Sequence, residues 1–225
     1  MAILCLETSA KVCSVALHAN GRLITSAEAH VEQSHATRLA PLIDDIVKLS
    51  KTDFTQVQAV AVSAGPGSYT GLRIGVSLAK GLCFALKIPL IAINTLELLA
   101  YQVRNQVEED ILLCPMIDAR RMEVYCMVVN NAFQSVQPIM PKVIDSESFS
   151  NFLDVNQILF FGDGAPKCKG VIHHSNALFL DKVYPQASKM GELAYQKFES
   201  GQVEDLESFE PVYLKEFMIK PARQS

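Results

Sequence analysis

The sequence lacks the features that mark several common classes of protein. None of its six cysteines forms a C-x-x-C pair, so neither a zinc site nor a disulfide framework is indicated. No apolar run reaches the roughly 18 residues that a membrane span needs. The apolar start is interrupted by Glu7 and Lys11 and carries no basic leader, which argues against a signal peptide. We therefore expect reduced core thiols in a cytoplasmic protein that does not enter the membrane.

The sequence also lacks a cluster of basic residues. It has 20 Lys and Arg against 24 Asp and Glu, for a net charge of −4. A protein that grips nucleic acid alone usually presents a basic face, so strong direct binding is disfavoured. The histidines show no zinc-ligand spacing: His30 and His35 would fall on different faces of a helix. No metal site is predicted.

The hydrophobic periods that are present indicate an α/β chain with two similar halves. A hairpin signal, Asn20-Gly21, lies between two of the first strands. A helix beginning after Ser146 would be capped by that residue. The predicted strands are 2–7, 13–18, 22–29, 59–63, 89–93, 112–117, 123–130, 137–144, 157–161 and 177–180, and the main helices are 35–49, 70–86, 95–103, 146–153 and 186–200.

Two βββαβα units in tandem are typical of a duplicated ribonuclease-H-like fold, the architecture of actin, sugar kinases and their ATPase relatives (the ASKHA class). Each domain would hold a mixed sheet flanked by helices. The polar stretch 104–110 marks the boundary between domains at 1–105 and 106–225. The last residues, from 215 on, are basic and polar, and we expect them to fray or to pack back.

The string GPGSYTG at 65–71 is the most distinctive motif. It joins a buried strand to a helix, where glycines and a helix N-terminus can cradle an anion. A Walker A loop needs a lysine after its last glycine, and Leu72 stands there instead. A tight strand-to-helix turn is the simpler interpretation.

Small residues recur every four positions along the helix that follows. Gly71, Gly75 and Ala79 would line one face, so another backbone is expected to come close to it. That neighbour is either the domain's own sheet or a helix of a second chain.

Acidic residues end the first strand of each half, Glu7 and Asp118. In actin-like ATPases such residues organise metal and phosphates. The alternative is structural, with Glu7 capping a turn and Asp118 pairing with Arg120 or Arg121. Gly162 and Gly164, in GDGA, resemble a glycine turn that holds adenosine. These four residues are the only candidates for cofactor binding, and no catalytic residue is assigned.

Several strings resemble the TsaB (YeaZ) family, closely over the first hundred residues and loosely from about 130 to 200. They are ILCLETS at 3–9, CSVAL at 13–17, HATRLAPLI at 35–43, GPGSYTGLRIG at 65–75, AKGL at 79–82, PLIAINTLE at 89–97, DARRMEVY at 118–125 and PVYLK at 211–215. The aspartate usual at the end of the first strand is replaced by Glu7, which weakens a metal-placing role.

The resemblance implies an actin-like protein without chemistry of its own. The catalytic paralogue, TsaD, carries two metal-binding histidines where this sequence has Thr95 and Leu99. The chain would then support TsaD, with the ATPase TsaE, in placing threonylcarbamoyl on adenosine beside the anticodon of tRNA. It would need no cofactor, any nucleotide being bound by the complex, and would meet tRNA only through the complex.

We predict that a second actin-like chain packs against helices 35–49 and 70–86. The residues expected at this interface are Leu39, Leu42, Gly71, Arg73, Gly75 and Ala79. The partner would be TsaD in the cell and a second copy of the chain when TsaD is absent. Two other classes stay open: an independent actin-like ATPase or sugar kinase, and a glycoprotease-type metallopeptidase.

Overall fold

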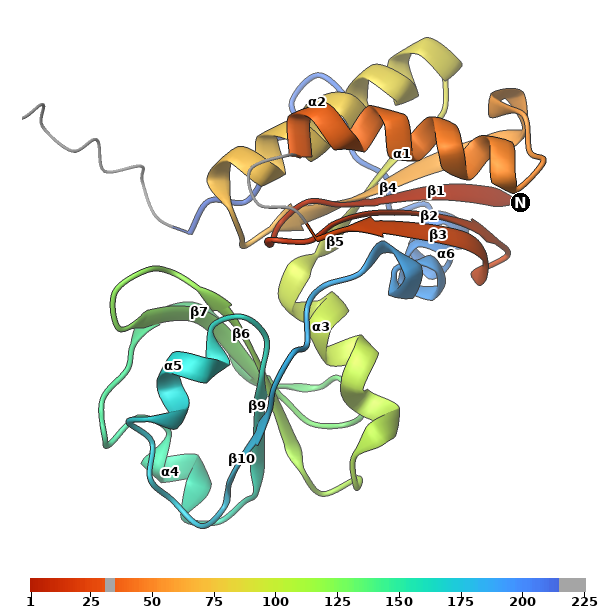
Figure 1. The fold of residues 1–225 in the computed structure, drawn as a ribbon. Helices are drawn as coiled ribbons and strands as arrows, with labels where there is room; N and C mark the ends of the chain where they lie inside the picture. Colours follow the sequence, from red (N-terminus) through yellow and green to blue (C-terminus); the bar gives the residue numbers. More distant parts are fainter. Residues whose placement is uncertain (31–34, 215–225) are drawn as a thin grey trace, which may run out of the picture.

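The computed structural model describes residues 1–30 and 35–214, and the predicted C-terminal fraying from 215 on lies outside them. Its two mixed five-stranded sheets have the strand orders β3-β2-β1-β4-β5 and β10-β9-β6-β7-β8. Figure 1 shows the first sheet and its helices above the second. Both sheets have the same plan, with an antiparallel hairpin on one side of the first strand and parallel strands on the other. The duplicated α/β prediction is confirmed.

The first half consists of three antiparallel strands followed by alternating helices and parallel strands. Asn20 and Gly21 form the predicted hairpin turn, both with positive φ. Its elements are β1 (Ala2–Glu7), β2 (Cys13–Ala19), β3 (Arg22–Ala29), α1 (His35–Leu49), the 3-10 turn η1 (Phe54–Gln56), β4 (Val57–Gly65), α2 (Tyr69–Leu86), β5 (Leu90–Asn94) and α3 (Thr95–Val103).

The second half repeats this order, and its first two helices are shorter than those of the first half. Its elements are η2 (Arg104–Gln106), β6 (Leu112–Asp118), β7 (Glu123–Val129), β8 (Ser135–Val143), α4 (Ser150–Leu153), β9 (Ile158–Phe161), α5 (Ala165–Lys169), β10 (Ala177–Leu180), η3 (Ala187–Lys189) and α6 (Gly191–Glu199).

Each sheet is covered on both faces. In the first half, α1 and α2 lie on the outer face and α6 on the inner one, as the three ribbon views agree. The side chains alternate accordingly: Leu4 and Leu6 join the core under α1 and α2, whereas Ile3 and Cys5 meet the core of η3 and α6. In the second half, α4 and α5 cover one face and α3 the other.

The two halves exchange helices. Leu96, Leu99 and Val103 of α3 belong to a core cluster of the second sheet, although α3 follows the first. Conversely, the chain returns from β10 to the first sheet, where Met190 and Ala194 are fully buried. A boundary between residues 105 and 106 therefore assigns each sheet to its own half. It does not do so for the helices, because α3 packs on the second sheet and α6 packs on the first.

Two predicted helices differ in the structure. The helix predicted from Ser146 is reduced to α4, because Asp145 and Ser148 bond to each other's backbone or side chain in a local turn that replaces the first helical turn. The predicted helix 186–200 is split into η3 and α6. All six cysteines are buried and free, which confirms that they are core thiols.

Candidate functional site

The first corner lies where β1 ends, and its centre is the carboxyl group of Glu7. This side chain is completely buried. It accepts hydrogen bonds from the Ser9 backbone N–H at 2.6 Å and from the hydroxyls of Ser9 and Ser63. Burial raises the pKa of Glu7, and the hydrogen bonds from the serines oppose that rise only in part. The carboxyl thus bonds to the turn that follows β1 and to Ser63 of β4, as in the turn-capping interpretation.

The glycine-rich loop that follows β4 packs directly on this turn. The Ser68 backbone N–H donates to the Ser9 carbonyl at 2.7 Å, and a Cβ on Gly67 would lie 2.5 Å from the same oxygen. The Ser68 hydroxyl accepts from the Gly71 N–H and caps α2. The β1–β2 turn therefore occupies the space that an anion-cradling loop would leave open, which favours the strand-to-helix turn.

The small face of α2 points inward, and this corrects its assignment to a partner interface. A Cβ on Gly71 would lie 2.1 Å from the Thr8 carbonyl oxygen, and one on Gly75 would lie 2.2 Å from Thr8 Oγ1. Ala79 is fully buried in the core below α1 and α2. The close neighbour that the glycines admit is therefore the chain's own β1–β2 turn.

The other predicted interface residues divide between core and surface. Leu39 is buried, and Leu42 is half-buried against the same core cluster. Arg73 is exposed: its guanidinium lies 4.2 Å from the centre of the Tyr69 ring, and its Nε donates to the Tyr213 hydroxyl at 3.3 Å. Of the six predicted residues, Arg73 alone lies fully on the surface.

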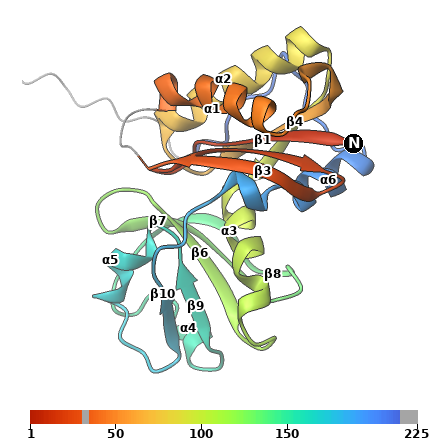
Figure 2. The same ribbon diagram turned by 45° about the vertical axis from the view of Figure 1, so that its right-hand side comes forward.

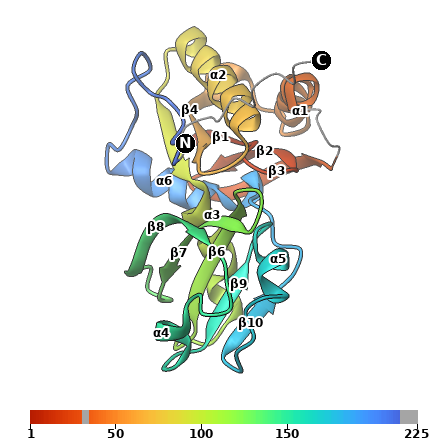
Figure 3. The same cartoon turned by 90° about the vertical axis from the view of Figure 1, so that its left-hand side faces the viewer.

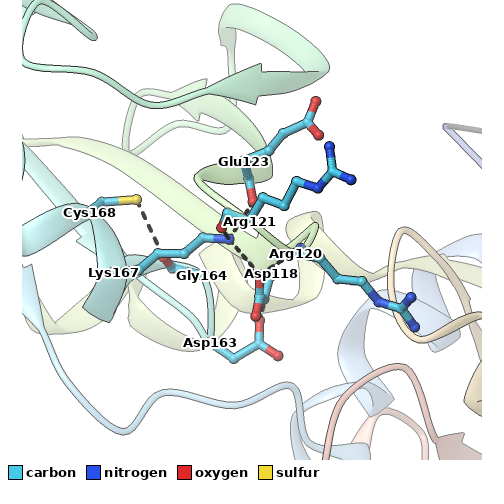
Figure 4. Close-up of polar contacts among 8 residues, drawn as sticks. All are labelled: Asp118, Arg120, Arg121, Glu123, Asp163, Gly164, Lys167 and Cys168. Atoms are coloured by element: carbon cyan, nitrogen blue, oxygen red, sulfur yellow. Dashed lines mark hydrogen bonds and ion pairs between the residues drawn. The ribbon is translucent and has the colours of Figure 1, made fainter.

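The second corner, at the end of β6, has a different chemistry (Figure 4). Asp118 is half exposed, and its carboxylate pairs with Lys167 of α5. It also accepts the Arg120 backbone N–H at 2.8 Å, while the Asp118 N–H donates to Asp163 at 2.9 Å. Burial raises the pKa of Asp163; the hydrogen bond from the Asp118 N–H opposes that rise, and the negative charge of Asp118 adds a smaller rise. The alternative in which Asp118 pairs with Arg120 or Arg121 is met only through the Arg120 backbone N–H, because the ion pair of Asp118 is with Lys167.

The glycines of GDGA serve the packing of β6. Gly162 has φ of +101°, and a Cβ there would lie 2.2 Å from the Met116 carbonyl oxygen. A Cβ on Gly164 would lie 3.0 Å from the Ile117 backbone. Both glycines permit close approach of two backbones.

Sequence reasoning missed three partners at these corners: Ser63, Asp163 and Lys167. Lys167 is 49 residues from Asp118, so only the pairing of β6 with β9 brings α5 beside it. Asp163 lies inside the GDGA string, but that string predicts a role for its glycines and none for the aspartate.

Metal and membrane signals are also missing from the part of the chain that is described. Residues 1–30 and 35–214 hold no group of three or more His, Cys, Asp or Glu side chains that could bind a metal ion. Thr95 and Leu99 are both fully buried. Within the same residues, no helix is long and apolar enough to cross a membrane.

Comparison with known proteins identifies the family. A family model described as "TsaD: tRNA N6-adenosine threonylcarbamoyltransferase" matches residues 26–216. The "tRNA threonylcarbamoyladenosine biosynthesis protein TsaB" of Haemophilus influenzae is 31% identical, over 96% of this chain and 94% of that protein. The chain belongs to the TsaB (YeaZ) family. Involvement in the biosynthesis of threonylcarbamoyladenosine in tRNA comes with that membership.

Solved structures agree. YeaZ from Pseudomonas aeruginosa superposes with a TM-score of 0.82 at 28% identity, covering 95% of this chain and 99% of that one. An activator of 2-hydroxyisocaproyl-CoA dehydratase from Clostridium difficile, at 9% identity and a TM-score of 0.53 over 90% of this chain and 97% of that one, shares the fold alone. These relatives do not favour the ATPase, sugar-kinase or metallopeptidase alternatives for this TsaB-family chain.

Proposed function

We propose that the chain is a non-catalytic, partner-binding subunit that supports a TsaD-type threonylcarbamoyltransferase together with a TsaE-type ATPase. The observation that carries this proposal is the closed first corner, where Glu7 and the glycine-rich loop bond to the chain's own serines. A hydrolytic site of the actin-like kind needs a carboxylate free to organise metal and phosphates at this position. Here the Glu7 carboxyl is buried and accepts hydrogen bonds from Ser9 and Ser63.

The second corner supports the same proposal. The Asp118 carboxylate is held by Lys167 and by the backbone of the next turn, so both acidic residues that could face a nucleotide already have partners. Thr95 and Leu99 replace the two metal-binding histidines that TsaD carries, and neither side chain is a good ligand for a transition metal. We therefore propose no cofactor for the chain itself, and contact with tRNA only within the complex.

The partner must bind a surface other than the small face of α2, because that face packs inside the chain. The opposite face of α2 is exposed, and its residues follow helical spacing: Thr70, Arg73, Ser77, Gly81 and Phe84. Phe84 is 81% exposed, and nothing lies within 4 Å of where a Cβ on Gly81 would be. Beside it α1 presents its own outer face (Figure 3). We propose that a TsaD-type chain docks here, and a second copy of this chain when that partner is absent.

The experiment is reconstitution with the TsaD-type and TsaE-type proteins of the same organism. Threonylcarbamoyl transfer to tRNA is measured with and without the chain, and copurification reports assembly. We expect transfer to require the chain, and Gly81→Arg to abolish copurification while the fold persists, because a long charged side chain would stand between the docking helices. Val155→Arg is the matched control, since Val155 is 76% exposed on the second half.

Undiminished transfer without the chain would contradict the supporting role. Normal copurification of the folded Gly81→Arg variant would contradict the proposed docking surface and leave the supporting role standing.

A further inference from the structure

The turn between β6 and β7 has a backbone that its residues do not prefer. Arg120 and Arg121 are both in the left-handed region, with φ of +64° and +46°. Long side chains rarely adopt this conformation, and two in succession persist only where the surroundings impose it. Such outliers cluster at active sites and at sites that clamp a ligand.

Asp118 and Lys167 of the second corner bind the backbone of this turn. Asp118 accepts the Arg120 N–H at 2.8 Å, and Lys167 Nζ donates to the carbonyls of Arg121, at 2.9 Å, and Glu123. The Glu123 N–H closes the turn on the Arg120 carbonyl at 3.2 Å. These bonds use backbone groups of Arg120, Arg121 and Glu123, and none uses a guanidinium. The ion pair of Asp118 with Lys167 therefore fixes the turn and leaves both arginine side chains available.

Both arginine side chains are exposed, and neither takes part in a salt bridge within residues 1–30 and 35–214. Figure 4 shows them extending away from Lys167, with Arg120 on the side of the view where the red and orange ribbons of the first half lie. The Asp118 carboxylate is paired with Lys167. The Glu123 side chain extends on the same side of the turn as Arg121 (Figure 4). Two adjacent positive charges are thus displayed on a rigid turn of a chain whose net charge is −4.

We propose that the Arg120–Arg121 turn binds a phosphate group, either in the backbone of tRNA held by the complex or in a free nucleotide. The planar guanidinium donates two parallel hydrogen bonds to phosphate oxygens, which a lysine cannot do. A turn fixed before binding loses little freedom when the ligand arrives. The tRNA arm rests on the proposed function, since it places the chain in a complex that holds tRNA.

The test uses Arg120→Asn/Arg121→Asn, because asparagine tolerates the left-handed backbone and removes both charges. Arg22→Asn/Lys182→Asn is the matched control: both residues are exposed, and Lys182 also has a positive φ, of 63°. Assembly with the TsaD-type partner is measured first. Equilibrium binding of tRNA and of ATP to the assembled complex is then measured across a range of salt concentrations.

We expect the arginine variant to assemble normally and to lose about tenfold in affinity for one of the two ligands. For tRNA, the slope of log affinity against log salt would fall by about one to two, as for one or two lost phosphate contacts. The control keeps wild-type affinity and slope. Loss confined to tRNA identifies the RNA backbone as the source, and loss confined to ATP identifies a nucleotide.

Unchanged affinity for both ligands would overturn the proposal, as would equal losses in the control. Failure of the arginine variant alone to assemble would also overturn it, since the turn would then contact protein. If the wild-type chain does not assemble, the proposed function has failed. The two ligands are then tested on the chain alone with the same variants and the same criteria.

Discussion

The two halves of the molecule place an acidic residue at the same point of the same topology and treat it in opposite ways. At the first corner, Glu7 is buried, bonded to serines and covered by the glycine-rich loop before α2. At the second, Asp118 is half exposed, paired with Lys167, and followed by two exposed arginines. Duplication fixes where a residue lies in the sheet, whereas the turns and helices around it decide whether it can meet a ligand.

The difference follows from helix length and packing. α2 has 18 residues and lies against the β1–β2 turn through glycines, so it closes the first corner. α5 has 5 residues and holds the β6–β7 turn through the side chain of Lys167, and both arginines of that turn are exposed. In our account the first half supplies a rigid, closed platform and the second half supplies exposed charge.

The largest effect is expected from breaking the closed corner. Gly75→Leu would drive a side chain into Thr8, whose Oγ1 lies 2.2 Å from the position of a Cβ. Since neither α2 nor the β1–β2 turn can move apart easily, we expect a loss of about 3 kcal/mol in the free energy of unfolding. Urea denaturation followed by circular dichroism measures it.

The matched control lies in the same helix. Gly81→Ala has open space around it and should stabilise the protein by about 0.5–1 kcal/mol through helix propensity. A Gly75→Leu protein as stable as the wild type would show that the small face is not packed internally after all.

A smaller effect is expected at the open corner. Lys167→Met removes the ion pair with Asp118 and the donor to two carbonyls, but Asp118 can still be solvated. We expect a loss of about 1–2 kcal/mol in the free energy of unfolding. Lys169→Met, which removes the exposed pair with Asp181, should cost less than about 0.5 kcal/mol. Equal losses in the free energy of unfolding for the two variants would mean that the contacts of Lys167 with Asp118 and the turn do not stabilise the fold.

The smallest effect concerns the dependence of stability on pH. The unfolded chain releases the proton of Glu7 near an ordinary pKa of about 4.3, whereas burial raises the pKa of the folded state above that value. Between the two pKa values the folded state binds the proton more tightly. The contribution of Glu7 to stability is therefore largest at low pH and falls as the pH rises through this window.

Glu7→Gln keeps the shape of the side chain and cannot titrate. The free energy of unfolding of the wild type should decline relative to Glu7→Gln as the pH is raised from about 4 toward neutrality. Chemical denaturation of both proteins over this range gives the comparison. Parallel profiles would show that Glu7 keeps an ordinary pKa and that the first corner is more open than its packing indicates.

Much of the fold could be predicted because the signals are local. Apolar strand segments, helical spacing and the Asn20-Gly21 hairpin all depend on neighbouring residues, and the structure confirms them. The helix predicted from Ser146 failed where a local bond between Asp145 and Ser148 competed with it. Spacing showed that Gly71, Gly75 and Ala79 share a face. It could not show what packs against that face, because small residues permit close approach either of the chain's own backbone or of a second chain.

The sites were harder to predict because their decisive contacts are distant in the sequence. Ser63 reaches Glu7 across 56 positions, and Lys167 reaches Asp118 across 49. No pattern within either segment signals these pairs. Both acidic residues could be found from their places at the strand ends, whereas their partners depend on strand order and on the length of the helix that follows.

The central claim is that the chain acts by binding partners and not through its own acidic residues. The most direct test measures threonylcarbamoyl transfer to tRNA by the reconstituted complex with the wild-type chain, with Glu7→Gln/Asp118→Asn, and without the chain. Our account predicts that the double variant, once shown to be folded and assembled, supports transfer as well as the wild type, and that omission abolishes it. Transfer lost with a folded, assembled double variant would contradict the claim and give the two carboxyl groups a part in the chemistry.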